Sequence, residues 1–284
     1  MVKVLKSGMY SSVQDLGRMG FQQYGVPYSG VMDVYSASLA NHILGNNTND
    51  AVIEMTITGI SLRFDCDTRI CISGATMAPE LNNQAIQMNK SIQVSAGDVL
   101  SFGKLAKGFR CYLAVFGGFK TEEVMGSRSM YNGVTSQSKI SKNDVFLINE
   151  MNSFTVSNNA LVKVKDEHFL SHRIDVYKGP EFDFLSKNQQ EFLFQNSFTV
   201  SKDNNRMAYQ LSEPLENNLE PIITSAVLPG TVQLTPSGKL IVLMRDCQTT
   251  GGYPRVLQLK ESAINRMAQK FTGSFIDFKL VGSR

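Results

Sequence analysis

The sequence predicts a mainly β protein built from many short strands with few helices. Apolar and polar residues alternate with a period near two over 61–73, 84–103 and 109–119, a pattern typical of half-buried strands. Asn-Asn at 82–83, Ala-Gly-Asp at 96–98 and Lys-Gly at 107–108 mark turns between these segments. Many short strands at such close spacing indicate barrels or sandwiches.

Further strands are expected along the rest of the chain, at 144–148, 161–165, 172–179, 197–201, 230–235 and 239–244. Two strand segments, 110–119 and 239–253, each lead into Gly-Gly followed by an aromatic residue. This echo favours two related β-rich halves. A polar, Asn-rich stretch near 150–172 suggests the boundary between them, so we expect one domain over 1–170 and a second over 171–284.

Three helices are predicted. Asp33 can cap a helix over 34–44 that ends at Gly45. Pro180 is expected to open a helix through "EFDFLSKNQQEFLF". Residues 261–271 place apolar side chains at helical spacing.

Composition excludes several classes of protein. The chain is 42% apolar and carries a formal charge of +3, which is too weak and too diffuse to indicate nucleic acid or an anionic membrane surface. We expect a cytoplasmic protein, because no apolar run approaches the roughly 20 residues of a membrane helix and no signal-peptide core is visible. No metal site is expected, because the cysteines and histidines lack ligand spacing; the cysteines should be free thiols.

The stretch "RDCQTTGGYPRV" (245–256) follows an apolar strand and raises a choice between a tight turn and a pocket wall. Alternation places Asp246 in an apolar row, where a carboxylate needs a cation or several donors. Gly251 and Gly252 permit a positive φ or a close approach to a ligand. Cys247 is disfavoured as a nucleophile, because no paired base is evident.

The stretch 11–33 combines Gln14, Asp15 and Arg18 with several glycines. Arg18 can clamp a carboxylate or phosphate with its planar fork. The alternative is that Asp15 and Arg18 pair with each other at a barrel rim. Three shorter stretches add one candidate site residue each: Gly74, Arg128 and, in "NRMAYQL", Arg206. Each stretch could instead be an ordinary turn.

These stretches occur in the order seen in one family, and "VQDLGR" (13–18) and "QTTGGYP" (248–254) are the most specific. Through them the chain resembles the allophanate hydrolase subunit 2 family, also called biotin-dependent carboxyltransferase-like proteins, over about residues 5 to 270. This resemblance implies two cyclophilin-like β-barrel domains. It selects the pocket wall over the turn for 245–256.

The resemblance also implies a function as the C subunit of an ATP-dependent 5-oxoprolinase, which opens 5-oxo-L-proline to L-glutamate. The expected partners are a B-like (KipI-like) and an A-like subunit; ATP would be shared with a partner, and biotin would not be on this chain. The residues implied as catalytic are Asp246, Asp15 and Arg18. Those implied for substrate or nucleotide binding are Gln14, Gly74, Ala75, Ser127, Arg128, Arg206, Gln248, Thr249, Thr250, Gly251, Gly252 and Tyr253.

Two other functions are compatible with the same resemblance. One is a KipA-like regulatory protein that binds and antagonises a kinase inhibitor. The other is a carboxyltransferase that acts on urea or a related amide with carboxybiotin. The chain departs from the family pattern at 133–144, at Ala208 where glycine is usual, and at 272–274, which puts the ligand contacts of one loop in question.

Overall fold

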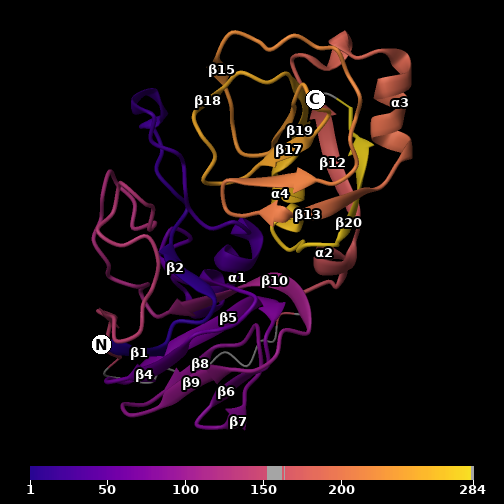
Figure 1. Ribbon diagram of the computed structural model, residues 1–284. Coiled ribbons are helices and arrows are strands. Elements are labelled where there is room, and N and C mark those ends of the chain that lie inside the picture. The colour runs from indigo at the N-terminus through magenta and orange to yellow at the C-terminus, as the bar shows by residue number, and fades with distance from the viewer. Residues whose placement is uncertain (152–161, 163, 283–284) are drawn as a thin grey trace. The chain divides into compact units, whose positions relative to one another are not determined.

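A computed structural model describes residues 1–151, 162 and 164–282. The described part is mainly β, with twenty strands and four α-helices, so the predicted fold class is confirmed. The chain forms two compact units (Figure 1): Met1–Arg18 with Ser29–Phe169, and Met19–Tyr28 with Leu170–Arg284. The segment 19–28 therefore groups with the second unit although it lies early in the chain.

The first unit contains two antiparallel sheets. One sheet has the strand order β11-β1-β4-β9-β6-β7 and the other β2-β3-β10-β5-β8. Most strands fall where alternation predicts them, while the strand expected at 161–165 falls on residues described only in part. The strands are β1 (Val2–Lys6), β2 (Tyr10–Gln14), β3 (Val52–Thr56), β4 (Ser61–Phe64), β5 (Thr68–Thr76), β6 (Pro79–Leu81), β7 (Gln84–Ala85), β8 (Ile92–Val94), β9 (Val99–Phe102), β10 (Lys107–Val115) and β11 (Val145–Phe146).

The five-stranded sheet is buried on both faces, but the two faces differ in chemistry. Alternate residues of its strands enter the main apolar core, among them Val13, Ile53, Met55, Ile72 and Leu113. The pairing register places a polar row on the other face, formed by Ser12, Glu54, Tyr112 and Ser73. Because side chains alternate between faces, this row gathers polar groups from four neighbouring strands.

Helix α1 (Val34–Leu44) follows the predicted bounds. Asp33 caps its N-terminus, with Oδ1 accepting from Ser36 N at 3.2 Å. Gly45 ends it with φ at 74°, a left-handed conformation in which glycine has no Cβ penalty. The helix packs its buried side chains into a second apolar cluster with Val52, Cys71 and Ala114 of the five-stranded sheet.

The second unit contains a closed barrel in the order β12-β19-β16-β17-β14-β13-β20. Its strands pair antiparallel except β12 and β20, which pair in parallel. Alternate residues such as Val232, Leu234 and Val242 are fully buried, as expected for the inner face of a small barrel. The strands are β12 (Arg173–Lys178), β13 (Phe198–Asn204), β14 (Ala208–Leu211), β16 (Thr231–Leu234), β17 (Leu240–Leu243), β19 (Arg255–Leu259) and β20 (Phe275–Leu280).

The predicted start of one helix in the second unit was wrong. Pro180 does not open a long helix; a short 3-10 turn (Phe182–Phe184) comes first. Helix α3 (Lys187–Gln195) begins only after Ser186, which forms a capping box with Gln189. A capping box satisfies two backbone donors at once, which a proline cannot do.

Two short helices complete the described chain. Helix α4 (Glu261–Met267) starts where predicted but is shorter than expected, and α2 (Glu167–Leu170) has no counterpart among the predicted helices. A two-stranded ribbon of β15 (Ser225–Ala226) and β18 (Thr250–Gly251) lies apart from the barrel sheet. Within the described residues, every helix is too short or too polar to span a bilayer.

Candidate functional site

The Asp15 carboxylate is the centre of a hydrogen-bond network in the first unit. Its Oδ1 accepts from the hydroxyls of Ser127 and Ser129, each at 2.6 Å, and from Gly17 N at 2.9 Å. Its Oδ2 accepts from Arg128 N at 2.6 Å. The fold thus joins the 13–18 motif to the loop that carries three of these donors, two stretches that are far apart in the sequence.

These contacts define what Asp15 does structurally. The side chain is buried, and four donors occupy the lone pairs that a carboxylate offers. A carboxylate held in this way fixes the loop around it. The catalytic role expected for Asp15 stays a prediction.

Arg18 contacts the same loop. Its buried guanidinium donates from Nε to Val124 O at 3.1 Å and from Nη2 to Ser129 O. The donors to Asp15 come from the loop and from Gly17, so a simple Asp15–Arg18 ion pair does not describe this region. Both motif residues act on one loop from the end of β2.

Arg128 lies partly in solvent, with 30% of its side chain exposed. Nη1 donates to Thr121 O, and Nη2 lies 3.0 Å from Glu123 Oε2. The residue lines a surface pocket of about 300 Å³ together with Glu122. Hydrogen bonds from Ser136 lower the pKa of Glu122, so this pocket has a carboxylate on its wall as well as an arginine.

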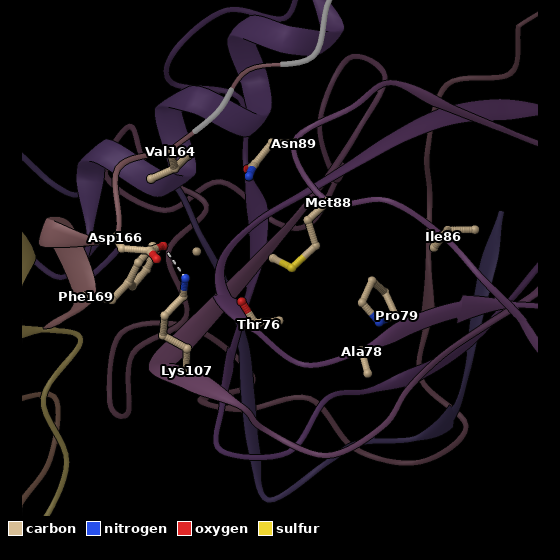
Figure 2. Close-up of a pocket in the computed structure, with 11 residues that line it drawn as sticks. Thr76, Ala78, Pro79, Ile86, Met88, Asn89, Lys107, Val164, Asp166 and Phe169 are labelled. Carbon is tan, nitrogen blue, oxygen red and sulfur yellow. Dashed lines mark hydrogen bonds and ion pairs between the residues drawn. The ribbon is translucent and has the colours of Figure 1, made fainter.

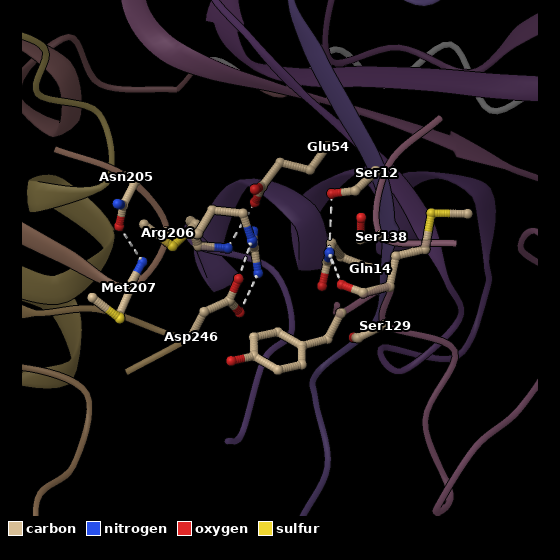
Figure 3. Close-up of polar contacts among 12 residues, drawn as sticks. Ser12, Gln14, Glu54, Ser129, Ser138, Asn205, Arg206, Met207 and Asp246 are labelled. Atoms are coloured by element: carbon tan, nitrogen blue, oxygen red, sulfur yellow. Dashed lines mark hydrogen bonds and ion pairs between the residues drawn. The ribbon is translucent and has the colours of Figure 1, made fainter. Parts of the chain in front are cut away.

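Gln14 is completely buried, and its amide orientation is fixed (Figure 3). Nε2 donates to Ser12 Oγ at 3.0 Å and to Met130 O at 3.1 Å. Because a carbonyl only accepts, the NH₂ group must face Met130. Oε1 is left buried without a donor among the described residues, and an unpaired buried acceptor is costly.

A buried charged cluster in the first unit was missed by the sequence analysis. Glu54 Oε2 accepts from Met32 N at 2.7 Å and from Tyr112 OH at 2.8 Å. Arg110 Nε lies 3.8 Å from Glu54 Oε1. Burial and the nearby Glu54 and Asp33 charges raise the pKa of Tyr112 well above its usual value, so the phenol stays a donor. The available signal was Glu54 itself, an acid inside the apolar run "AVIEMTI".

The capping residue Asp33 has a second role that local sequence did not indicate. Its Oδ2 accepts from Ser36 Oγ at 2.6 Å and lies 2.7 Å from His168 Nε2. The imidazole also packs against the ring of Tyr35 at 4.9 Å between centroids. One carboxylate therefore both starts α1 and orients a histidine from a distant part of the chain.

Gly74 and Ala75 are neighbours in sequence, but the structure gives them different surroundings. Gly74 has φ at 88°, and a Cβ there would lie 2.6 Å from Arg110 O, so glycine is required. It lines a pocket of about 370 Å³ (Figure 2). Ala75 instead belongs to the apolar core, and its packing does not support the ligand contact predicted for it.

In the second unit, Asp246 meets the cation that its apolar surroundings require. Arg206 donates from Nε to Oδ2 at 2.8 Å and from Nη2 to Oδ1 at 3.0 Å (Figure 3). Asp246 N also donates to Arg206 O at 2.9 Å. Both side chains are buried. The structure therefore joins two predicted site residues in a bidentate pair, the strong form of this interaction.

The predicted segment from Gln248 to Tyr253 forms one side of the β15–β18 ribbon. Thr249 O accepts from Val227 N at 3.1 Å, and Gly252 O accepts from Ile222 N at 3.0 Å. The side chains of Gln248, Thr250 and Tyr253 are exposed. The ribbon holds the backbone while three predicted side chains reach solvent.

Of the two reasons predicted for glycine at 251 and 252, a positive φ is wrong, because neither residue has one. Close approach to a ligand stays a prediction. A Cβ on Gly251 would lie 2.5 Å from Gln233 Nε2, whereas one on Gly252 would meet only Ile222 O at 3.5 Å. A side chain at 251 would therefore force the buried Gln233 side chain of another strand to move.

Two ionisable groups of the second unit have perturbed pKa values. Burial, and then the Asp246 charge, raise the pKa of Cys247 to about 12, so its thiol stays protonated and the nucleophile hypothesis is not supported. Burial, and then Arg266, lower the pKa of Lys270 to about 8. Lys270 is buried together with Asn265 and Gln269, polar residues near α4 that the sequence analysis missed.

Metal ligation has no candidate in the described part of the chain. There, no three or more His, Cys, Asp or Glu side chains gather closely enough to hold an ion.

Comparison with known proteins identifies the family. The family described as "Carboxyltransferase domain, subdomain A and B" matches residues 24–280. The chain belongs to this family. The resemblance seen in its sequence motifs is thereby confirmed.

Named relatives fall into two groups. The C subunit of 5-oxoprolinase from Escherichia coli is 30% identical over 98% of this chain and 90% of its own length. The urea amidolyase of Lachancea kluyveri is 32% identical over 97% of this chain, which spans only 17% of that protein. The crystal structure of the K. lactis urea amidolyase matches 99% of this chain and 19% of its own, with a TM-score of 0.87 at 28% identity.

Proposed function

We propose that this chain is the C-type subunit of an ATP-dependent 5-oxoprolinase, active only with its partner subunits. The proposal rests on the share of each relative's length that this chain matches. The chain matches 90% of the length of the E. coli 5-oxoprolinase relative but 17% of the urea amidolyase relative. A relative matched along nearly its whole length supports a shared role more strongly than one matched over a small part.

The chemistry of the reaction sets what the site must supply. A lactam resists water at neutral pH, so its carbonyl oxygen must first be turned into a leaving group, which ATP can do by phosphorylation. Water then adds to the activated carbon, the ring C–N bond breaks as the nitrogen takes up a proton, and a second water hydrolyses the resulting acyl phosphate to carboxylate and phosphate. Donors that stabilise charge on oxygen and groups that move a proton are needed.

We assign recognition of the substrate amide to Gln14. Met130 O and Ser12 fix the direction of its amide, and Oε1 is a buried acceptor with no donor of its own among the described residues. The N–H of a lactam would satisfy that acceptor. This role fits a substrate that carries an amide N–H and disfavours an ester.

We assign proton transfer to Asp246, with Arg206 as its positioning residue. The bidentate contact holds the carboxylate in one direction. ATP is proposed to be shared with a partner subunit. In support, the guanidiniums of Arg206 and Arg18 already contact a carboxylate and backbone carbonyls, which makes them poor candidates for neutralising a triphosphate.

Reconstitution tests the proposal. The chain is purified alone and with B-like and A-like partner subunits, and 5-oxoproline-dependent ADP release is measured. We expect turnover only in the full mixture. Asp246→Asn should lower it by about 10²–10⁴-fold, while Asp203→Asn, an exposed acid of the same unit, should leave it unchanged. Full activity from the isolated chain would contradict the proposal.

A second candidate is carboxyl transfer from carboxybiotin to urea or a related amide. It is favoured by the name of the family and by the urea amidolyase relatives. The same preparations, supplied with carboxybiotin and urea in place of ATP and 5-oxoproline, distinguish the two. Carboxylated urea without any 5-oxoproline turnover would select this alternative.

A further inference from the structure

The pocket beside Gly74 has the size and chemistry of a ligand site in its own right. Its volume is about 370 Å³, within the usual range for small-molecule sites. It lies wholly in the first unit, at the ends of β5 and β10 (Figure 2). None of the roles assigned above uses it.

One side of the pocket is apolar and firmly supported. Pro79, Ile86, Met88 and Phe169 line it. Ile86 and Met88 pack against the main apolar core of the unit, so this wall is an extension of the core. It offers a preformed surface to an aliphatic or ring-shaped group.

The opposite side carries the ion pair of Lys107 and Asp166, and an irregularity in the sheet brings the lysine there. The pairing of β10 with β5 is irregular between two residue pairs, Lys107 with Thr76 and Cys111 with Gly74. Four residue steps along β10 therefore lie opposite only two along β5. A bulge of this kind re-aims the side chains next to it. Lys107 and Thr76 both line the pocket as a result.

Lys107 forms an ion pair with Asp166, which also lines the pocket and whose side chain is 65% exposed. An exposed ion pair of this kind contributes little to stability. A ligand carboxylate can therefore take the place of Asp166 beside the ammonium, while the Asp166 side chain turns to solvent. Lys107 Nζ also lies 5.5 Å from the centre of the Phe169 ring, which keeps the charge beside the apolar wall.

A hydrogen-bond acceptor completes the pocket. Asn89 is held in a left-handed conformation with φ at 55°, and its N donates to Ile72 O at 2.8 Å. Its Oδ1 is buried and lacks a donor among the described residues. Buried acceptors are normally paired, so this atom indicates a ligand group that brings an N–H.

We propose that this pocket binds a small carboxylic acid with an apolar body and an N–H donor. The carboxylate contacts Lys107, the N–H donates to Asn89 Oδ1, and the apolar body lies against Met88 and Phe169. The class includes N-acylated amino acids. The inference does not depend on the proposed function, because binding to the isolated full chain needs neither ATP nor a partner.

The test uses N-acetyl-L-leucine as the probe, with two analogues that each lack one feature. Its methyl ester removes the charge, and N-acetyl-N-methyl-L-leucine removes the N–H. Calorimetric titration of the full chain should give saturable one-to-one binding of the probe. Each analogue should bind about tenfold or more weakly, as expected for losing one charged or neutral hydrogen bond.

Variants locate the binding. Lys107→Met should weaken the probe about tenfold and leave the methyl ester unchanged, while Lys104→Met, an exposed lysine nearby, should change neither. Asn89→Gly keeps the left-handed backbone and should remove the preference for N–H over N-methyl. Equal binding of probe and ester to the native chain, or undiminished probe binding by Lys107→Met, would overturn the proposal. Absence of saturable binding would also overturn it, whatever the 5-oxoprolinase assay gives.

Discussion

Asp15 and Asp246 are both buried aspartates that were predicted to be catalytic, yet the two units hold them differently. Asp15 is surrounded by neutral donors, two hydroxyls and two backbone N–H groups. Asp246 faces one guanidinium that binds both of its oxygens. The neutral donors around Asp15 come from a loop, so this carboxylate anchors that loop. The guanidinium that binds Asp246 forms an ion pair with it and holds the carboxylate in one orientation.

The largest expected effect comes from splitting the charged pair. Arg206→Met leaves the Asp246 carboxylate buried beside an apolar side chain, which should lower stability by about 3–5 kcal/mol. At roughly 2–4 °C per kcal/mol for a domain of this size, the fall in melting temperature is readily measured by calorimetry.

The double variant Arg206→Met with Asp246→Leu is the control for that experiment. It removes both charges, so it should be more stable than Arg206→Met alone. Turnover in the reconstituted complex should stay low in both. If the double variant is the less stable of the two, the pair is not an isolated charge-neutral unit.

Breaking the Asp15 network should have a smaller effect. Asp15→Asn turns one acceptor into an NH₂ group that faces Arg128 N, so two donors meet. We expect a loss of about 2–3 kcal/mol by urea unfolding and faster hydrogen exchange in the loop 124–129.

Ser129→Ala is the matched comparison, since it leaves the carboxylate and removes one hydroxyl, which donates to Oδ1 and accepts from Asp15 N. It should cost about 1–2 kcal/mol, less than Asp15→Asn. An Asp15→Asn protein as stable as the native chain would show that the network does not anchor the loop.

Gly251, at the end of β18, and Gly252, which follows it, give a matched pair. Gly251→Ala should destabilise by about 1–3 kcal/mol through overpacking, because its Cβ would meet Gln233 Nε2. Gly252→Ala has room and should cost less. Thermal unfolding compares the two single variants with the double variant Gly251→Ala, Gln233→Ser. If the serine at 233 does not restore stability to Gly251→Ala, overpacking against Gln233 is not the reason for the loss, and a ligand or the backbone is.

Lys270 provides the most pH-dependent effect. Its pKa is lowered from 10.5 to about 8 in the folded chain, so below pH 8 the ammonium is charged in both states and its burial is fully destabilising. Between pH 8 and 10.5 the folded state loses this proton first, and stability rises. The native chain should therefore gain stability relative to Lys270→Met over that range, measured by urea unfolding at each pH; a constant difference would contradict the shifted pKa.

Elements whose causes are local could be predicted from the sequence. Alternation predicted strands such as β4, β5 and β10, and Asp33 and Gly45 set both ends of α1, because capping and left-handed termination act within a few residues. The apolar row around Asp246 also predicted that this carboxylate needs a cation. Where two local signals competed, as at Pro180 and Ser186, the capping box fixed the start of α3.

Which residues meet could not be predicted from local patterns. The cation for Asp246 comes from position 206, and the hydroxyl donors for Asp15 lie 112 and 114 residues further along the chain. Gly251 faces Gln233 of another strand, and Lys107 lines a pocket beside an irregularity in β10. Such partnerships depend on strand register and sheet order, which set distances between segments that no local pattern specifies.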